Sequence, residues 1–183
     1  MKDSIGNALE AWRVRRVLPE IEGNLLDIGC GNNRLVRVHG NGIGVDVFPW
    51  EGIDLLVEDA SRLPFDDNTF DTVTFLACLN HIPNRNDVLR EAHRLLKPGG
   101  KIVVTMIPPR LSRIWHFLRR PWERDQHERG MKKGEVYGLT RRQVKELLER
   151  NGFEIRRQYS FMFQINSITT GFAVTRIAAE GDH

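Results

Sequence analysis

An acid and two glycines follow a short apolar run near the start of the chain, and this arrangement is its strongest chemical signal. Residues 25–31 read Leu-Leu-Asp-Ile-Gly-Cys-Gly. The apolar residues favour a buried strand, and Gly29 and Gly31 allow a sharp turn with a ligand against the main chain. At the carboxyl end of a strand in an α/β sheet, such a turn builds a site for a nucleotide-like cofactor.

Two further acids end later apolar runs. Asp46 closes the run at 42–47, and Asp59 closes the run at 54–59. A single Asp after a strand often only caps a helix or shapes a turn. Three acids at the ends of three consecutive predicted strands instead favour a shared ligand site. Asp46 stands where a carboxylate can accept from both hydroxyls of a ribose.

Apolar runs and helical patterns alternate along the rest of the chain. A leading helix is predicted over 4–18, a second helix from Asn84 or Asn86 to Leu96, and a third from the capping box Thr140–Gln143 to Asn151. Strands are predicted over 24–28, 42–47, 54–59, 70–76, 101–107, 153–163 and 171–178. This alternation predicts a Rossmann-like, doubly wound, seven-stranded sheet, mostly parallel with the last strand antiparallel, and helices on both faces.

Composition sets the limits of the interpretation. The 183 residues, 40% of them hydrophobic, fit a single globular domain over 1–183, with a leading helix in 1–20. No apolar run is long enough to span a bilayer, and the start lacks the apolar core of a signal peptide. The two cysteines form neither a disulfide framework nor a zinc cluster. We therefore expect a cytoplasmic protein without a metal.

Several segments, in a fixed order, resemble a known family. The chain resembles the class I S-adenosylmethionine-dependent methyltransferases, in the group that includes small-molecule and quinone methylases. The matching segments are residues 26–31, 44–46, 58–65, 70–73 and 95–100, and a later match covers the predicted closing helix and strand near 139–153. The resemblance implies S-adenosyl-L-methionine as the cofactor and methyl transfer as the activity.

The resemblance also implies residue roles. Asp27 would order the loop, and the backbone at Gly29, Cys30 and Gly31 would cradle the methionine part of the cofactor. Asp46 would bind the ribose hydroxyls. The remaining implied contacts are Val47 against the adenine, Asp59 with its exocyclic amine, the Ala60 backbone with the ring, Ala77 and Cys78 beside the methyl group, and Arg13 with the carboxylate.

One departure from the family pattern follows the second glycine. Where many members have a third small residue, this chain has Asn32, Asn33 and Arg34, and the segment before the next strand is short. We expect a tight turn there rather than a long helix. The same departure weakens the alternative of an NAD-dependent oxidoreductase, because a dinucleotide fingerprint needs a third glycine where Arg34 stands.

The catalytic residues stay open. A general base is needed only where the acceptor carries a proton on its reacting atom. The candidates are His81, after the fourth strand, and His127, in the variable segment. In this family a histidine at the position of His81 is more often a packing and hydrogen-bonding residue. A non-catalytic S-adenosylmethionine-binding module is therefore a second alternative.

Residues 108–139 are predicted to form a lid that selects the acceptor. Residues 110–133 carry eight basic and three acidic side chains, although the whole chain has a net charge of +3. This segment fits a solvated lid, a pocket for a small-molecule or amphipathic acceptor, or peripheral membrane contact through 110–122. Nucleic acid is not favoured, because the basic run is short and a base-amine methylase motif is missing. The sequence does not predict the oligomeric state.

Overall fold

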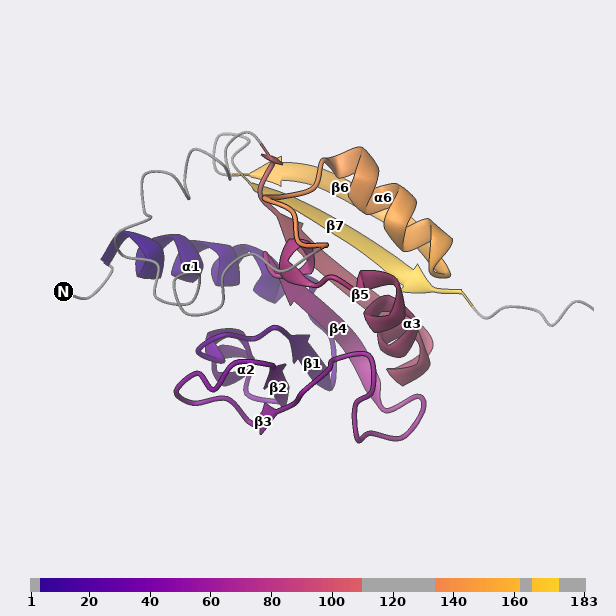
Figure 1. Ribbon diagram of the computed structural model, residues 1–183, viewed down its shortest axis with the longest axis horizontal. Coiled ribbons are helices and arrows are strands. Elements are labelled where there is room, and N and C mark those ends of the chain that lie inside the picture. The colour runs from indigo at the N-terminus through magenta and orange to yellow at the C-terminus, as the bar shows by residue number, and fades with distance from the viewer. Residues whose placement is uncertain (1–3, 110–133, 162–165, 175–183) are drawn as a thin grey trace, which may run out of the picture.

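A seven-stranded sheet forms the centre of the structure, a computed structural model that describes residues 4–109, 134–161 and 166–174. The strand order is β3-β2-β1-β4-β5-β7-β6 (Figure 1). β1 to β5 pair in parallel, whereas β7 runs antiparallel to both of its neighbours, which confirms the predicted sheet. The strands are β1 (Leu25–Ile28), β2 (Gly42–Asp46), β3 (Leu55–Leu56), β4 (Phe70–Leu76), β5 (Leu96–Met106), β6 (Phe153–Phe161) and β7 (Asn166–Ala173).

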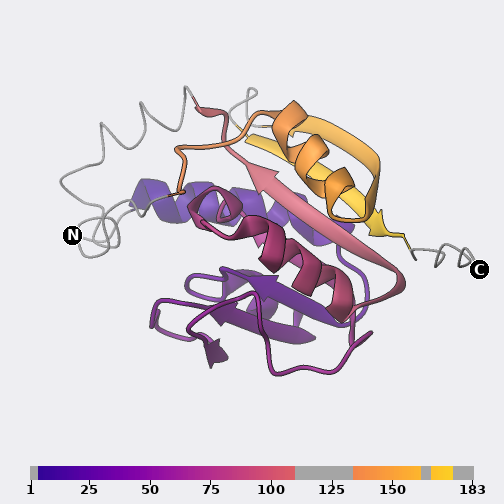
Figure 2. The same ribbon diagram turned by 45° about the vertical axis from the view of Figure 1, so that its right-hand side comes forward.

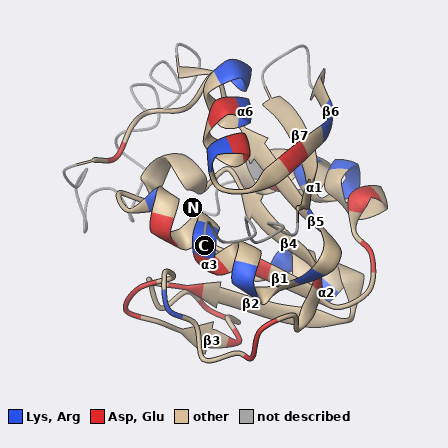
Figure 3. Ribbon diagram, turned by 90° about the vertical axis from the view of Figure 1, so that its right-hand side faces the viewer, with Lys and Arg blue, Asp and Glu red and all other residues tan. Residues whose placement is uncertain are grey.

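Helices cover both faces of this sheet. The helical elements are α1 (Ser4–Val17), η1 (Leu18–Glu20), α2 (Arg34–His39), η2 (Leu79–His81), α3 (Arg85–Leu95) and α6 (Arg141–Arg150). Helices α3 and α6 lie on one face and α1 on the other (Figure 2). Lys, Arg, Asp and Glu residues occur along α3 and α6, whereas the middle of the sheet carries few of them (Figure 3).

The alternation of side chains along β1 explains where its acid points. Leu26 and Ile28 belong to the buried cluster that contains the apolar residues of α3 and α6. Leu25 belongs to the cluster on the opposite face, with Val14 of α1. Successive side chains of a strand point to opposite faces. Asp27 therefore shares the face of Leu25 and lies beneath α1.

The helix signals in the sequence are confirmed at α6. The Thr140 hydroxyl accepts from the backbone N–H of Gln143 at 3.2 Å, and the Gln143 side chain accepts from the backbone N–H of Thr140 at 2.9 Å. The helix ends at Arg150 and is followed by Gly152 at φ +88°. At α3 the start is confirmed, but the Asn84 side chain donates to Asp59 instead of capping the helix.

Three predicted strands were wrong in extent. β5 begins at Leu96 rather than at Lys101. β3 contains only Leu55 and Leu56, so Asp59 does not end a strand but lies in the loop beyond it. β7 begins at Asn166 rather than at Gly171. The run from Asn166 to Thr170 is polar but buried, because β7 lies inside the sheet with both neighbours paired. Hydroxyl bonds such as that from Ser167 Oγ to the carbonyl oxygen of Met106 (3.3 Å) satisfy part of this polarity.

The first crossover is short, as predicted. A turn at residues 31–33 leads into the six-residue helix α2. Asn33 adopts φ +59° and is buried, and its side-chain amide donates to the carbonyl oxygen of Gly52 at 3.0 Å and to Asp54 at 2.8 Å. The buried asparagine therefore ties the crossover to the loop before β3.

The candidate lid falls largely outside the described residues. Residues 110–133, which include His127 and the segment considered for membrane contact, are among the undescribed ones. Within the described ranges, helices long and apolar enough to cross a membrane are absent. The same ranges contain no group of three or more His, Cys, Asp or Glu side chains that could hold a metal ion.

Candidate functional site

A cavity of about 310 Å³ opens at the carboxyl end of β1, between the glycine loop and α1. Four of the predicted cofactor residues line it, namely Asp27, Gly29, Cys30 and Gly31. Arg13 of the leading helix lines it as well. The lining also contains residues that were not predicted, among them Glu10, Asn32 and Trp50.

The glycine loop needs its glycines for two different reasons. Gly29 has φ +73° and Gly31 has φ +56°, conformations that residues with a side chain rarely adopt. A Cβ on Gly29 would also lie 2.7 Å from the Cβ of Cys78, whereas a Cβ on Gly31 would have no atom within 4 Å. The first glycine thus allows close packing against the residue after β4, and the second leaves open space beside the cavity.

Asp46 holds the loop from the neighbouring strand. One carboxylate oxygen accepts from the backbone N–H of Gly31 at 2.9 Å, and the other accepts from the backbone N–H of Phe48 at 3.0 Å. Asp46 is outside the cavity lining itself, but these bonds place its carboxylate beside the loop. Each oxygen keeps a lone pair with which it can accept from a further hydroxyl.

Asp27 is a buried carboxyl at the floor of the cavity. Its side chain is 1% exposed and accepts from the hydroxyl of Thr74 at 2.6 Å. The pKa of Asp27 is raised to about 7, mainly by burial; the Thr74 bond lowers it, and the nearby charges of Asp46 and Glu10 contribute to raising it. A cation placed in the cavity would favour the ionised form of Asp27.

Arg13 supplies the opposite charge from α1. Its Nε atom is buried and has no hydrogen-bond partner among the described residues. Burial lowers the pKa of Arg13, and the Glu10 carboxylate opposes this effect. Glu10 itself accepts from the side-chain amide of Asn32 at 3.1 Å. The cavity therefore has a buried guanidinium with an unused donor on the same wall as a carboxylate.

Asp59 and Ala60 lie on a loop beside the sheet, outside the cavity lining. Asp59 is exposed and accepts from the backbone N–H of Ser61 at 2.8 Å, from its hydroxyl at 2.7 Å and from Asn84. The bonds from Ser61, followed by that from Asn84, lower the pKa of Asp59. Ala60 is buried in the core cluster on the α3 side.

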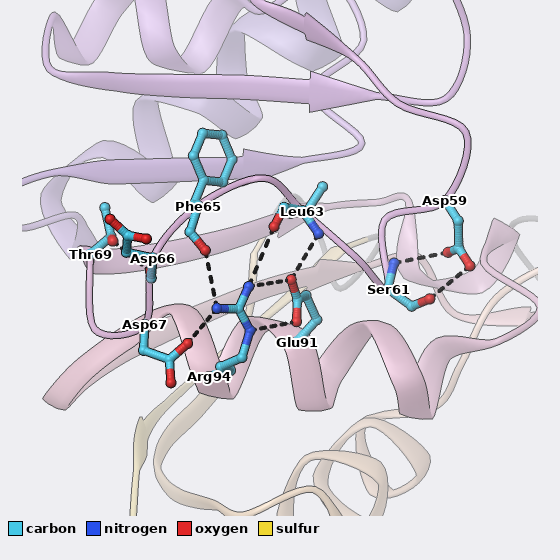
Figure 4. A network of polar contacts seen from close by, with 9 residues as sticks. All are labelled: Asp59, Ser61, Leu63, Phe65, Asp66, Asp67, Thr69, Glu91 and Arg94. Atoms are coloured by element: carbon cyan, nitrogen blue, oxygen red, sulfur yellow. Dashed lines mark hydrogen bonds and ion pairs between the residues drawn. The ribbon is translucent and has the colours of Figure 1, made fainter.

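An ion-pair network fastens this loop to α3 (Figure 4). Arg94 donates to both carboxylate oxygens of Glu91, at 2.9 and 2.7 Å, and to the carbonyl oxygen of Phe65 at 3.1 Å. Glu91 in turn accepts from the backbone N–H of Leu63 at 2.8 Å. The loop that carries Asp59 is thus held by side chains of α3 rather than by strand pairing.

The remaining predicted residues lie around the loop without lining the cavity. Val47 is 44% exposed just after β2. Ala77 adopts φ +54°, and the Cys78 thiol donates to the carbonyl oxygen of Ile28 at 3.0 Å. Burial raises the pKa of the Cys30 and Cys78 thiols, and both cysteines are free. These cysteines are therefore poor nucleophiles at neutral pH.

His81 lies at the end of η2, three residues after Cys78. Its Nδ1 atom is 3.6 Å from a carboxylate oxygen of Glu135, which enters from the segment that follows the undescribed residues. The other histidine candidate, His127, lies outside the described residues.

Comparisons with known proteins agree with this geometry. The profile of a methyltransferase domain family matches residues 26–104. A ubiquinone/menaquinone biosynthesis C-methyltransferase from Desulfotalea psychrophila is 44% identical over 73 residues, which are 39% of this chain and 30% of that protein. These matches confirm the predicted resemblance to class I S-adenosylmethionine-dependent methyltransferases over this part of the chain.

Longer matches at lower identity cover more of this chain. A ubiquinone/menaquinone biosynthesis C-methyltransferase from Burkholderia mallei is 26% identical over 143 residues, which are 67% of this chain and 57% of that protein. The chain therefore spans less than two thirds of the length of these curated relatives.

Solved structures support the fold. A chain in the complex of the Haloferax volcanii Trm112 methyltransferase activator with a methyltransferase matches with a TM-score of 0.71 at 17% identity, covering 94% of this chain and 95% of that one. A SAM-dependent methyltransferase from Thermotoga maritima matches with a TM-score of 0.63 at 20% identity, covering 91% and 95%. The resemblance to these methyltransferases implies S-adenosylmethionine as the cofactor.

The sequence predicted Arg13 of α1, but not Glu10 of the same helix or Trp50 of the loop after β2. Glu10 and Arg13 are three residues apart, so they lie on one side of the leading helix. That spacing, together with the rarity of buried charged side chains, was the signal that could have found Glu10. Trp50 carried no comparable signal.

Proposed function

We propose that this chain transfers the methyl group of S-adenosylmethionine to a small-molecule acceptor and that the cavity beneath α1 binds the amino-acid end of the cofactor. The observation that carries the proposal is that Arg13 lines a cavity also lined by Asp27, and that its buried Nε lacks a partner among the described residues. The cofactor has both a carboxylate and an ammonium group at this end. A guanidinium and a carboxyl group on opposing walls match that pair of charges.

Within this proposal each residue has a separate task. Arg13 pairs with the cofactor carboxylate, and Asp27 faces the ammonium group. The backbone at Gly29, Cys30 and Gly31 follows the methionine part. The adenosine and methyl-group contacts fall to the residues around the loop, namely Asp46 for the ribose, Val47, Asp59 and Ala60 for the adenine, and Ala77 and Cys78 beside the methyl group.

The protein contributes position rather than covalent chemistry. When bound, S-adenosylmethionine supplies an electrophilic methyl group on a sulfonium centre. The chain holds the acceptor in line with that methyl group, which removes much of the entropic cost of a bimolecular step. Arg13 and Asp27 fix the charged end, and Asp46 keeps the loop in shape through its bond to Gly31.

For the acceptor we propose a quinone-like or other amphipathic small molecule. This choice is supported by the names of the relatives, which act in ubiquinone and menaquinone biosynthesis. Selection of the acceptor is assigned to the lid at residues 108–139 within a single domain over 1–183, with peripheral membrane contact through 110–122 as part of the same proposal. An acceptor of this kind is largely apolar, so a membrane surface is where it would be met.

Isothermal titration calorimetry with S-adenosylmethionine and S-adenosylhomocysteine tests the proposal. We expect both to bind the wild-type protein and Asp46→Ala to weaken binding by more than about tenfold, because a charge-assisted hydrogen bond contributes about 1.5–3 kcal/mol. Asp87→Ala, at an exposed ion pair on α3, is the matched control and should bind like wild type. If the wild type binds neither compound, the proposal is wrong. If it binds both but methylates no acceptor in a quinol panel, the proposed quinone-like acceptor is wrong, and failure across a wider range of acceptor classes would favour the non-catalytic module.

A further inference from the structure

A buried acid, Glu135, lies beside His81, just after the undescribed residues 110–133. The side chain of Glu135 is 3% exposed, and its Oε1 atom has no hydrogen-bond partner among the described residues. Its Oε2 atom is 3.6 Å from Nδ1 of His81, whose side chain is 23% exposed. Burying a carboxylate with an unused oxygen is costly, so this arrangement needs a reason.

Backbone and amide bonds fix the two residues relative to each other. The backbone N–H of Val136 donates to the carbonyl oxygen of Asn80 at 3.0 Å, and the Asn80 side chain donates to the carbonyl oxygen of Val136 at 3.1 Å. These reciprocal bonds join the neighbours of Glu135 and His81. The segment around Val136 is thus held against η2 by bonds that do not involve the side chains of Glu135 and His81.

Arg85 of α3 completes the charged surroundings. It donates to the carbonyl oxygens of Gly134 at 2.7 Å and of Leu79 at 3.4 Å, so its hydrogen bonds go to the backbone. The Glu135 carboxylate lies close enough to raise the pKa of Arg85, although burial lowers that pKa overall. The Arg85 side chain therefore lies beside Glu135 without occupying the Oε1 atom.

His81 lies three residues after Cys78, the residue that the proposed function places beside the methyl group. η2 begins directly after Cys78, which packs against Gly29 of the cofactor loop and bonds to the end of β1. A proton on Nδ1 of His81, directed at Glu135, leaves the lone pair on Nε2. A base whose second nitrogen is oriented by a carboxylate is a recurring arrangement for proton abstraction. Such contacts are often long before the substrate is bound.

We propose that His81 is the general base for the acceptor and that Glu135 is a positioning residue that orients the ring and stabilises its charge, an inference that rests on the proposed function. The acceptor's nucleophilic atom bonds to the methyl carbon, and the carbon–sulfur bond breaks with its electron pair remaining on sulfur. The proton that the acceptor loses passes to Nε2 of His81 and then to solvent. The acceptor class is one with an ionisable proton, such as a hydroquinone or phenol.

An NMR titration of His81 in the complex with S-adenosylhomocysteine tests the pair without an acceptor. Glu135→Gln is expected to lower the pKa of His81 by about one unit or more, because a carboxylate at this distance favours the charged ring. His93, whose Nε2 is 3.1 Å from the carbonyl oxygen of Val174, is the internal control and should titrate unchanged. Glu149→Gln, at an ion pair on α6, is the control variant. An unchanged pKa of His81 in Glu135→Gln overturns the proposal.

Methyl transfer to a short-chain demethylmenaquinol, followed against pH, tests the role as a base. His81→Asn should lower kcat by about 10²–10⁴-fold while the affinity for S-adenosylhomocysteine stays unchanged. Glu135→Gln should move the acidic limb of the kcat profile to lower pH by the same shift as the NMR pKa. The assignment of His81 as the base is wrong if the kcat of His81→Asn is within threefold of wild type. It is also wrong if the acidic limb of the kcat profile does not move in Glu135→Gln. If the wild type binds the cofactor but does not methylate the quinol, the proposed acceptor class is wrong. The NMR titration still tests whether Glu135 raises the pKa of His81.

Discussion

Asp27→Asn is expected to stabilise the cofactor-free protein, and by an amount that depends on pH. The pKa of Asp27 rises from 3.8 to about 7 on folding, mainly because the carboxyl group is fully buried. The ordinary value applies to the unfolded chain. Below both values each state is protonated and the group has no effect. Between them the folded protein keeps a proton that the unfolded chain has lost, so stability falls as the pH rises.

The size of this effect follows from the shift. Each pKa unit corresponds to about 1.4 kcal/mol, so a shift of about three units predicts a penalty of about 4 kcal/mol above neutral pH. An asparagine carries no such penalty, and its side-chain oxygen can still accept from Thr74 as the carboxylate does at 2.6 Å. The stability gained by Asp27→Asn should therefore widen by about 1.4 kcal/mol per pH unit between about pH 5 and pH 7 and then level off.

Urea unfolding of both cofactor-free proteins across this range measures the difference. Asp71→Asn is a control of opposite sign, because the Lys97 bond followed by the Asn24 bond lowers the pKa of Asp71. Asp71 contributes stability above its unfolded pKa and loses it as the pH falls through its folded pKa. Asp71→Asn should therefore destabilise the protein at neutral pH. A constant difference between wild type and Asp27→Asn across the range would refute the reasoning.

Four further substitutions test the glycine loop, the Arg94 network and the cap of α6. Gly29→Ala should destabilise the protein by about 1–3 kcal/mol more than Gly31→Ala in urea unfolding, because only the first adds a clash to the strained φ; equal losses would contradict this. Arg94→Met should cost about 1–3 kcal/mol by leaving the buried Glu91 carboxylate short of donors, and an unchanged melting temperature would show that the network does not hold the loop. Thr140→Ala should cost about 1 kcal/mol through the lost capping bond, with no loss of cofactor affinity.

Much of the fold could be predicted because local signals agreed with the tertiary structure. The strand at β4 and the capping box at Thr140 were found at their observed positions, since β-branched runs and caps act over a few residues. β3 was overextended because an apolar run at a sheet edge need not pair along its length. β7 was misplaced because polar side chains at Ser167 and Thr169 are buried by neighbouring strands that the sequence does not show.

In the site, too, local sequence signals predicted some residues, whereas others depend on tertiary packing. The glycine loop and Asp46 could be predicted because their positions follow from strand ends within one βαβ unit. Trp50 could not, because it reaches the cavity from a loop whose packing depends on the whole sheet, whereas Glu10 could have been found from its spacing to Arg13. Glu135 and His81 are more than fifty residues apart in the sequence, so only the tertiary fold shows their contact.

The orientation of the cofactor is the central claim, and calorimetry with two related ligands tests it most directly. S-adenosylhomocysteine carries the amino-acid end that Arg13 is proposed to bind, whereas 5′-methylthioadenosine lacks it. Arg13→Met should weaken binding of S-adenosylhomocysteine by about tenfold or more, because a charged hydrogen bond contributes about 1.5–3 kcal/mol, and should leave methylthioadenosine binding unchanged. Equal affinity of wild type and Arg13→Met for S-adenosylhomocysteine would contradict the account.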